Sequence, residues 1–347
     1  MPGDGIGNDV MDAARIVLDR SGLDAEYVPA EVGWECWEKY GNTVPKDTWE
    51  VLESTDVCLF GAITSKPGIK GFKSAILQIR QRFDLYTNMR PIRAYPGNPL
   101  NYRDDIDIMI FRENTEGLYK GIEFSPVPPD LADMLGLRTN PLETAISLRV
   151  LTREGCYRII RKAFEFAASK GKKKVTVVEK ANVLRKTGGM FLEEAARVKK
   201  EFPDIDMEVV NVDAMAMWLI KNPQRYEVLV TSNLFGDIIS DEASQLVGGL
   251  GFAASANIGE RYALFEPTHG SAPKYAGKYV TNPMAMLIST RLMLEHIGEH
   301  RIANALEKGI EGVIREGKVR TYDMGGNAST LEMAEAVADK MEMYLSN

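Results

Sequence analysis

The sequence is poor in cysteine and has no long apolar run. Only three cysteines, Cys36, Cys58 and Cys156, occur in 347 residues, which excludes a disulfide framework and favours a reducing compartment. The longest apolar stretches, such as 57–63, fall far short of the roughly 20 residues that a membrane-spanning helix needs. No basic segment followed by an apolar one stands at the N-terminus, so we expect no export signal and a cytoplasmic protein.

An excess of positive charge is also missing. Lys and Arg together number 42 against 49 Asp and Glu, which gives a net charge of −7 and argues against nucleic acid or an anionic membrane as a partner. No Cys/His cluster has zinc-ligand spacing, and neither a phosphate-binding Walker loop nor a G-x-S-x-G elbow occurs. These absences exclude several common enzyme classes.

The composition is that of an ordinary globular protein, with 45% hydrophobic and 26% charged residues. The length is about 2.3 times that of a typical 150-residue domain, which favours two domains. Short β-branched runs predict strands at 56–60, 85–89, 106–111, 174–179, 207–212 and 228–231. Apolar residues at helical spacing predict helices at 152–170, 194–201, 283–297, 301–317 and 331–344. Alternating strands and helices predict an α/β protein with a largely parallel sheet.

Three loop-like segments punctuate this pattern. Residues 95–104 are rich in Pro, Gly and Asn and are a candidate crossing between domains. Residues 124–139 carry three prolines, and 248–251 hold three glycines after a helical segment. Near the N-terminus, Gly3, Gly5 and Gly7 lack G-x-G-x-x-G spacing and follow no strand, so they predict a tight turn that leads into a helix near Asn8.

The segment 233–242 has a stronger functional pattern. It follows the strand predicted at 228–231, at the carboxyl end where α/β sheets bind their ligands. Asp237 and Asp241 are four residues apart, which places both carboxylates on one helix face and suits a hard cation such as Mg²⁺ or Mn²⁺. Carboxylates that complement a helix dipole would have the same spacing, so the residues alone leave both interpretations open.

Several arginines precede that segment. Arg80, Arg90 and Arg112 lie near predicted strands, and converging guanidinium groups suit a polycarboxylate substrate. A solvated surface is the alternative, and it explains Arg82 and Arg93 well.

Three further side chains lie near predicted strand ends or in loops. Tyr119 is either a proton donor or a half-buried aromatic residue, and Lys180 is either a general base or a solvated cation. His269, in a loop with Gly and Pro, is either functional or simply exposed.

Taken together, these segments resemble the β-decarboxylating dehydrogenases that act on isocitrate, homoisocitrate or 3-isopropylmalate. The most specific similarities lie at 112–121, 180–184, 233–251 and 266–277, in the order that the family has. The resemblance implies two interleaved α/β domains with a cleft between them, formed by 1–96 plus 248–347 and by 97–247. It also implies a homodimer whose subunits share active sites.

The resemblance assigns roles to particular residues. Arg80, Arg90 and Arg112 match the arginines that hold the substrate carboxylates, and Tyr119 and Lys180 match the catalytic pair. Asp213, Asp237 and Asp241 match the carboxylates that bind Mg²⁺ or Mn²⁺, with Lys180 and Asp213 acting in the partner subunit's site. The matching cofactor contacts are Thr64, Asn182, Glu266, His269, Gly270, Ser271, Ala272, Lys274, Tyr275, Asn282 and Tyr322.

The cofactor preference is predicted from two departures from the NAD-type pattern. Lys274 and Tyr275 stand where NAD-dependent members usually carry Asp-Ile, and Tyr322 replaces a proline. A cation and two phenols suit the 2′-phosphate of NADP, so we expect NADP, with NAD as the alternative.

The substrate is predicted from residues 73–80. Ser74 matches the serine of isocitrate enzymes, whereas Ile76 replaces their asparagine, and Leu77 and Lys73 meet the isopropylmalate pattern only in part. We therefore expect isocitrate, with homoisocitrate or 3-isopropylmalate as alternatives.

A non-catalytic regulatory subunit is the rival from another class. Such subunits typically lose the tyrosine, the lysine or the aspartates that this chain keeps. Two other features depart from the family: residues 124–141 are longer than the usual arm, and the short strand that usually precedes the Gly3–Gly7 turn is missing from the printed sequence.

Overall fold

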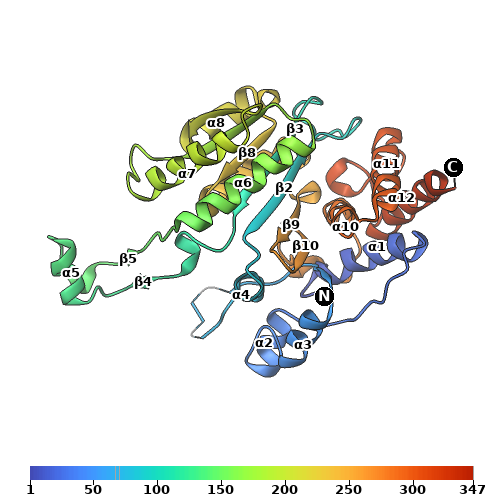
Figure 1. The fold of residues 1–347 in the computed structure, drawn as a ribbon. Coiled ribbons are helices and arrows are strands. Elements are labelled where there is room, and N and C mark those ends of the chain that lie inside the picture. Colours follow the sequence, from blue (N-terminus) through green and yellow to red (C-terminus); the bar gives the residue numbers. More distant parts are fainter. Residues whose placement is uncertain (67, 70, 347) are drawn as a thin grey trace.

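The computed structural model describes residues 1–66, 68–69 and 71–346. A mixed sheet of eight strands runs through the molecule in the order β1-β10-β9-β2-β3-β8-β6-β7 (Figure 1). The strands are β1 (Val57–Leu59), β2 (Thr87–Arg93), β3 (Asp107–Glu113), β6 (Lys174–Glu179), β7 (Asp206–Asn211), β8 (Val228–Thr231), β9 (Ala254–Ile258) and β10 (Ala263–Pro267). The predicted α/β class is therefore confirmed, and every predicted strand overlaps one that the sheet contains.

The sheet is parallel towards both ends and antiparallel in the middle. β1 pairs in parallel with β10, and β3, β8, β6 and β7 form a parallel set. Between them, β10, β9, β2 and β3 pair antiparallel. Strands β1, β2, β9 and β10 come from the two ends of the chain, and the parallel set comes from its middle. The division into domains at 96/97 and 247/248 stays a prediction.

Helices from both ends of the chain cover one half of the sheet. They are α1 (Ile6–Arg20), α10 (Met284–His296), α11 (His300–Glu316) and α12 (Thr330–Leu345), and α1 lies beside α12 in Figure 1. α10 packs on β9 and β10 and is apolar on most of its surface, because α1 and α11 cover it on its other sides. A single apolar cluster joins these helices to the strands.

Two helix pairs sandwich the parallel half. α6 (Arg153–Ser169) and α7 (Thr187–Glu201) cover one face, and α8 (Val212–Lys221) and α9 (Asn233–Gln245) cover the other. Successive strand residues alternate between the two cores, so Val177 contacts the first and Val178 the second. These packed layers place the carboxyl ends of β3 and β8 beside α9.

The structure extends one predicted helix. Residues 194–201 were expected to be helical, whereas α7 already begins at Thr187. Gly188 and Gly189 weaken the helical pattern of that first turn, but a Cβ at Gly188 would lie 2.9 Å from the Ala181 Cα. Glycine is therefore retained there because the backbone after β6 passes close to the helix.

An arm projects from the body of the molecule (Figure 1). Strands β4 (Glu123–Phe124) and β5 (Ile146–Ser147) form its antiparallel stem, and α5 (Pro129–Leu135) lies at its tip. The loop expected at 124–139 thus contains a helix. The remaining helices are α2 (Trp34–Tyr40), α3 (Lys46–Ser54) and α4 (Ala75–Arg82), with single 3₁₀ turns at Leu118–Lys120, Pro141–Glu143, Pro223–Arg225, Gly249–Phe252, Pro273–Tyr275 and Tyr322–Met324. Among the described residues, no helix is long and apolar enough to cross a membrane.

Candidate active site

Arg112, at the end of β3, is the most deeply buried cation of the site and is only 1% exposed. Its Nε and Nη2 atoms donate to Asn233 Oδ1 at 3.0 and 2.8 Å, and its Nη1 atom forms an ion pair with Asp237. The Tyr119 hydroxyl donates to the other oxygen of Asp237. Burial, and then this hydrogen bond, raise the pKa of Tyr119, which therefore keeps its proton at neutral pH.

Arg90, on β2, faces both aspartates of α9. Its Nη2 atom lies 3.3 Å from Asp237 Oδ1, and its Nη1 atom lies 3.2 Å from Asp241 Oδ1 and donates to Ser240 Oγ at 2.6 Å. Burial raises the pKa of Asp241. Burial also acts against ionisation of Asp237, but Arg112 and Arg90 outweigh it and lower that pKa. The two carboxylates thus lie on one helix face, as their spacing predicts.

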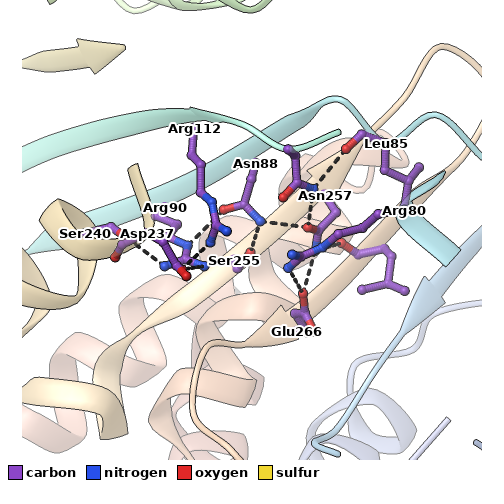
Figure 2. Close-up of polar contacts among 12 residues, drawn as sticks. Arg80, Leu85, Asn88, Arg90, Arg112, Asp237, Ser240, Ser255, Asn257 and Glu266 are labelled. Carbon is purple, nitrogen blue, oxygen red and sulfur yellow. Dashed lines mark hydrogen bonds and ion pairs between the residues drawn. The ribbon is translucent and has the colours of Figure 1, made fainter. Parts of the chain in front are cut away.

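Arg80, on α4, completes the set of buried arginines. Its Nη2 atom lies 2.9 Å from Glu266 Oε1 on β10, and both side chains are buried. Figure 2 shows Arg80, Arg90 and Arg112 in one row across the sheet. Three buried guanidinium groups in one row can bind more than one carboxylate of a small acid.

The first turn of α4 lies beside this row. Ser74 is the N-cap residue of α4, but its hydroxyl accepts no hydrogen bond from the amides of the first turn. Lys73 is exposed, whereas Ile76 and Leu77 are half-buried. The segment predicted to recognise the substrate therefore has a hydroxyl that does not cap the helix and two half-buried apolar side chains.

Lys180 and Asp213 form a separate pair. Lys180 follows β6, and its Nζ atom lies 2.5 Å from Asp213 Oδ1 in the first turn of α8, which lowers the pKa of Asp213. Asn182 is exposed nearby in the chain. Among the described residues, no group of three His, Cys, Asp or Glu side chains is arranged to hold a metal ion. One chain therefore does not unite Asp213 with the aspartates of α9.

Many of the predicted cofactor contacts line a second region. Thr64 Oγ1 lies 2.6 Å from Ser271 Oγ, and the Ser271 carbonyl accepts the Ile6 amide at 2.8 Å. The backbone at Gly5, where φ is +56°, passes so close to Ser271 that a Cβ there would lie 2.2 Å from the Ser271 carbonyl oxygen. An open groove of about 540 Å³ borders Thr64 and the 273–279 loop. The glycine-rich turn is therefore part of this surface.

The residues predicted to select NADP lie together. The Tyr275 and Tyr322 rings stack with centroids 6.4 Å apart, and the Lys274 Nζ atom lies 5.3 Å from the Tyr275 ring centre. Lys278, which no sequence pattern predicts, lies 5.9 Å from the same ring. This lysine–tyrosine cluster presents two cations and two phenols.

Polar atoms without partners lie in the adjoining loops. The buried His269 Nε2 and Thr281 Oγ1 atoms have no hydrogen-bond partner among the described residues. Burial lowers the pKa of His269, which favours the neutral imidazole. Asn282 donates to Asp323 at 3.0 Å, Gly270 is exposed, and Ala272 has a positive φ of 35°. Such unpaired atoms fit the polar ring edges of a nucleotide.

Comparisons with known proteins agree on one family. The model described as "Isocitrate/isopropylmalate dehydrogenase" matches residues 1–337. The chain belongs to this family. It is 43% identical to the 3-isopropylmalate dehydrogenase of Methanothermobacter thermautotrophicus and 44% identical to the homoisocitrate dehydrogenase of Methanocaldococcus jannaschii, with 99% of this chain and 97% of each relative covered. The crystal structure of isocitrate dehydrogenase from Methylococcus capsulatus matches with a TM-score of 0.90 and 41% identity over 98% of this chain and 97% of that one.

Family membership confirms the predicted reaction class. Members of the isocitrate/isopropylmalate dehydrogenase family are metal-dependent β-decarboxylating dehydrogenases that act on small hydroxy acids with NAD(P). The residues present fit these groups in two respects. Asp237 and Asp241 offer hard oxygen ligands on one helix face, and the unpaired His269 and Thr281 atoms fit a nucleotide.

Sequence reasoning missed the residues that support the arginines. Asn88 and Asn257 are completely buried, and Ser255 accepts a hydrogen bond from Asn88. The sequence does contain a pattern that could have identified two of them: Ser255 and Asn257 are two residues apart in a segment of otherwise apolar residues. That spacing places both polar side chains on one face of a strand.

Proposed function

We propose that this chain catalyses the metal-dependent, NADP-linked oxidative decarboxylation of isocitrate to 2-oxoglutarate and CO₂. The observation that carries the proposal is the row of three buried arginines beside the two aspartates of α9. Arg80, Arg90 and Arg112 would bind the substrate carboxylates, and Ser74 would donate to the distal one.

The proton transfers fall to two side chains. Lys180, in its neutral amine form, accepts the proton of the substrate hydroxyl. Tyr119, whose raised pKa keeps it protonated, delivers a proton to the carbon that loses CO₂. When bound, NADP supplies the hydride acceptor, and a divalent metal held by Asp237, Asp241 and Asp213 supplies positive charge beside the substrate oxygens.

The proposal includes a homodimer in which Lys180 and Asp213 act in the site of a second copy. Within one chain these two residues pair with each other, and Asp213 does not join the α9 aspartates. The adjoining helices expose apolar side chains that suit an interface: Met217 and Ile220 on α8 are 51% and 54% exposed, and Ile238 on α9 is 58% exposed.

Two observations favour an alternative substrate. Ile76 and Leu77 are half-buried beside Ser74, and the relatives reported above include enzymes named for homoisocitrate and 3-isopropylmalate. The second candidate function is therefore the same reaction on one of those acids. A non-catalytic subunit is disfavoured, because Tyr119, Lys180 and the aspartates are all present.

The test is a matrix of kcat/KM values. Purified protein with Mg²⁺ is assayed with isocitrate, homoisocitrate and 3-isopropylmalate, each with NADP and with NAD. We expect isocitrate with NADP to give the highest value. A tenfold or greater preference for 3-isopropylmalate with NAD would overturn both the substrate and the cofactor assignments.

The cofactor assignment has its own test. Lys274→Asp combined with Tyr275→Ile removes a cation and a phenol from the lysine–tyrosine cluster and should shift the preference towards NAD. An unchanged ratio of the two kcat/KM values would contradict NADP selection by this cluster.

A further inference from the structure

A row of buried side chains, with the amides of Asn88 and Asn257 at its centre, connects Arg90 with Arg80 (Figure 2). Asn88 on β2 stands opposite Arg112 on β3 in the sheet register, and opposite Asn257 on β9 on its other side. Both asparagines have no exposed surface. Their strands come from opposite ends of the chain and are neighbours in the sheet.

The hydrogen bonds of this row are continuous. Asn88 Oδ1 accepts the Nε–H of Arg90 at 2.9 Å, and Asn88 Nδ2 donates to Asn257 Oδ1 at 2.7 Å. Asn257 Nδ2 then donates at 2.8 Å to Glu266 Oε1, which also accepts from Arg80. An unbroken path of hydrogen bonds therefore connects the guanidinium of Arg90 with that of Arg80.

Each amide is held in one orientation. Asn88 Nδ2 also donates to Ser255 Oγ at 2.9 Å, and Asn257 Oδ1 also accepts from Asn114 at 2.9 Å. With its carbonyl oxygen and both amide hydrogens directed at fixed partners, neither side chain can rotate without leaving a buried polar group unpaired, which is costly. The hydrogen-bonded path therefore fixes the position of Arg90 relative to Arg80.

We propose that Asn88 and Asn257 are positioning residues that fix the distance and orientation of Arg90 and Arg80 for two carboxylates of one substrate. The inference rests on the proposed function, in which these arginines bind the hydroxy acid. It also gives Glu266 a role besides the cofactor contact expected for it: its carboxylate anchors Arg80 to the row.

Leucine is the informative replacement, because its side chain has the same number and branching of heavy atoms as asparagine and no polar atoms. Asn88→Leu removes the acceptor that orients Arg90, and Asn257→Leu removes the donor that holds Glu266. Losing one hydrogen bond to a charged group corresponds to about tenfold in affinity. We therefore expect each variant to raise the KM of the hydroxy acid about tenfold, with kcat changing much less. The KM of the cofactor should also change much less in Asn88→Leu, which leaves the bonds of Glu266 to Asn257 and Arg80 in place.

Asn98→Leu is the matched control. Asn98 is also buried and also bonded, to the Val247 carbonyl and the Leu100 amide, but it lies outside the row. It should lower the denaturation midpoint without changing the KM of the hydroxy acid. If all three variants lose stability equally and none changes that KM, the amides are only structural and the proposal is wrong.

A pH profile provides a readout that a purely structural role would not affect. Asn257→Asp keeps the acceptor for Asn88 and Asn114 but sets a second carboxylate against Glu266. Glu266 on β10 and Arg80 on α4 are the charged groups that face this position, while Asn88 and Asn114 are neutral. Protonation of the introduced carboxyl restores a donor to Glu266, so the ratio of variant to wild-type Kd for the hydroxy acid should fall as the pH decreases.

Direct calorimetric titration of the acid into the Mg²⁺-loaded protein measures that Kd. A ratio that stays constant with pH would overturn the positioning role while leaving the activity assignment intact. A wild-type protein that turns over and binds none of the three hydroxy acids would instead overturn the proposed function, and this inference with it.

Discussion

At the scale of one residue, Tyr119 is the proposed proton donor, and replacing it tests the proton transfer to the substrate. Its hydroxyl donates to Asp237, whose other oxygen is neutralised by Arg112 and Arg90. Tyr119→Phe keeps the ring but removes the proton donor, so we expect kcat to fall at least about 100-fold. The KM of the hydroxy acid should change little, because the arginines remain in place.

Steady-state kinetics with the preferred acid and cofactor measure both parameters. Tyr102→Phe, at a tyrosine that is 57% exposed, is the control and should behave as wild type. A raised KM with unchanged kcat in Tyr119→Phe would mean that this residue binds the substrate rather than supplying a proton.

The burial of His269 should make the unfolding free energy of the protein depend on pH. Burial lowers its pKa below the ordinary value of 6.5, so below that pH the unfolded chain binds a proton that the folded chain resists. The stabilisation is complete above pH 6.5 and is lost as the pH falls through the folded-state pKa. His269→Gln should therefore reduce the loss of unfolding free energy between neutral and acidic pH, measured by urea denaturation.

The same substitution at the exposed His300 is the control for that experiment. Its loss of stability on acidification should match that of the wild type. If His269→Gln and His300→Gln lose the same unfolding free energy between neutral and acidic pH, burial of the His269 ring has no measurable effect on folding.

The sequence allowed the charged residues of the site to be predicted better than their neutral supports. Arginines near strand ends and two aspartates at helical spacing are visible in the sequence as candidates, although a solvated surface or a helix dipole gives the same pattern. Asn88 and Asn257 carry no charge, and their role depends on which strands become neighbours. That pairing joins residues 169 positions apart, which no local pattern specifies.

At the scale of elements, Arg149 joins three chain segments next to Lys180. Its guanidinium donates to both oxygens of Glu179 at the end of β6, to Thr187 at the start of α7, and to Ser232 just before α9. The Glu179 side chain is completely buried and also accepts the Lys180 amide at 3.0 Å. The start of α9 and the position of Lys180 therefore depend on one ion pair.

Glu179→Leu should destabilise the protein strongly, because it leaves the Arg149 charge buried without its partner. We expect a cost of about 3–5 kcal/mol, measured as unfolding free energy in urea. The double variant Glu179→Leu with Arg149→Met removes both charges and should recover most of that loss. A double variant as unstable as the single one would show that the hydrogen bonds to Thr187 and Ser232, rather than the unpaired charge, dominate.

Elements were predictable where apolar residues are large and regularly spaced. α6 matches its predicted range within one residue at each end, and Thr152 caps it by accepting the Gly155 amide. β9 and β10 were missed, because 254–258 is alanine and small polar residues, and 263–267 ends in Glu-Pro. Neither segment has the β-branched enrichment by which strands are recognised, and both are strands because the sheet and α10 cover them.

At the scale of the whole molecule, the candidate site residues lie in both the antiparallel and the parallel parts of the sheet. Arg90, Arg112 and the amide row lie in its antiparallel centre, with Arg80 on α4 bonded to Glu266 of β10. Lys180 follows β6, and Asp213 lies in the first turn of α8, in the parallel half. Within one chain, Asp213 is not joined to the α9 aspartates. If the proposed homodimer completes the site, a subunit that lacks Tyr119 and a subunit that lacks Lys180 should together form one intact site.

Co-expression of Tyr119→Phe with Lys180→Met tests this sharing of sites. Each variant alone should be nearly inactive, but a mixed dimer has one site with both defects and one site with none. Random pairing gives half mixed dimers, so activity should recover to about a quarter of wild type.

Tyr119→Phe with Arg112→Met is the matched control: both substitutions affect the same side of the site, so neither site of the mixed dimer is intact and no recovery is expected. Equal activity from the two mixtures would show that each chain completes its own site, and Lys180 would then act within the chain that carries it.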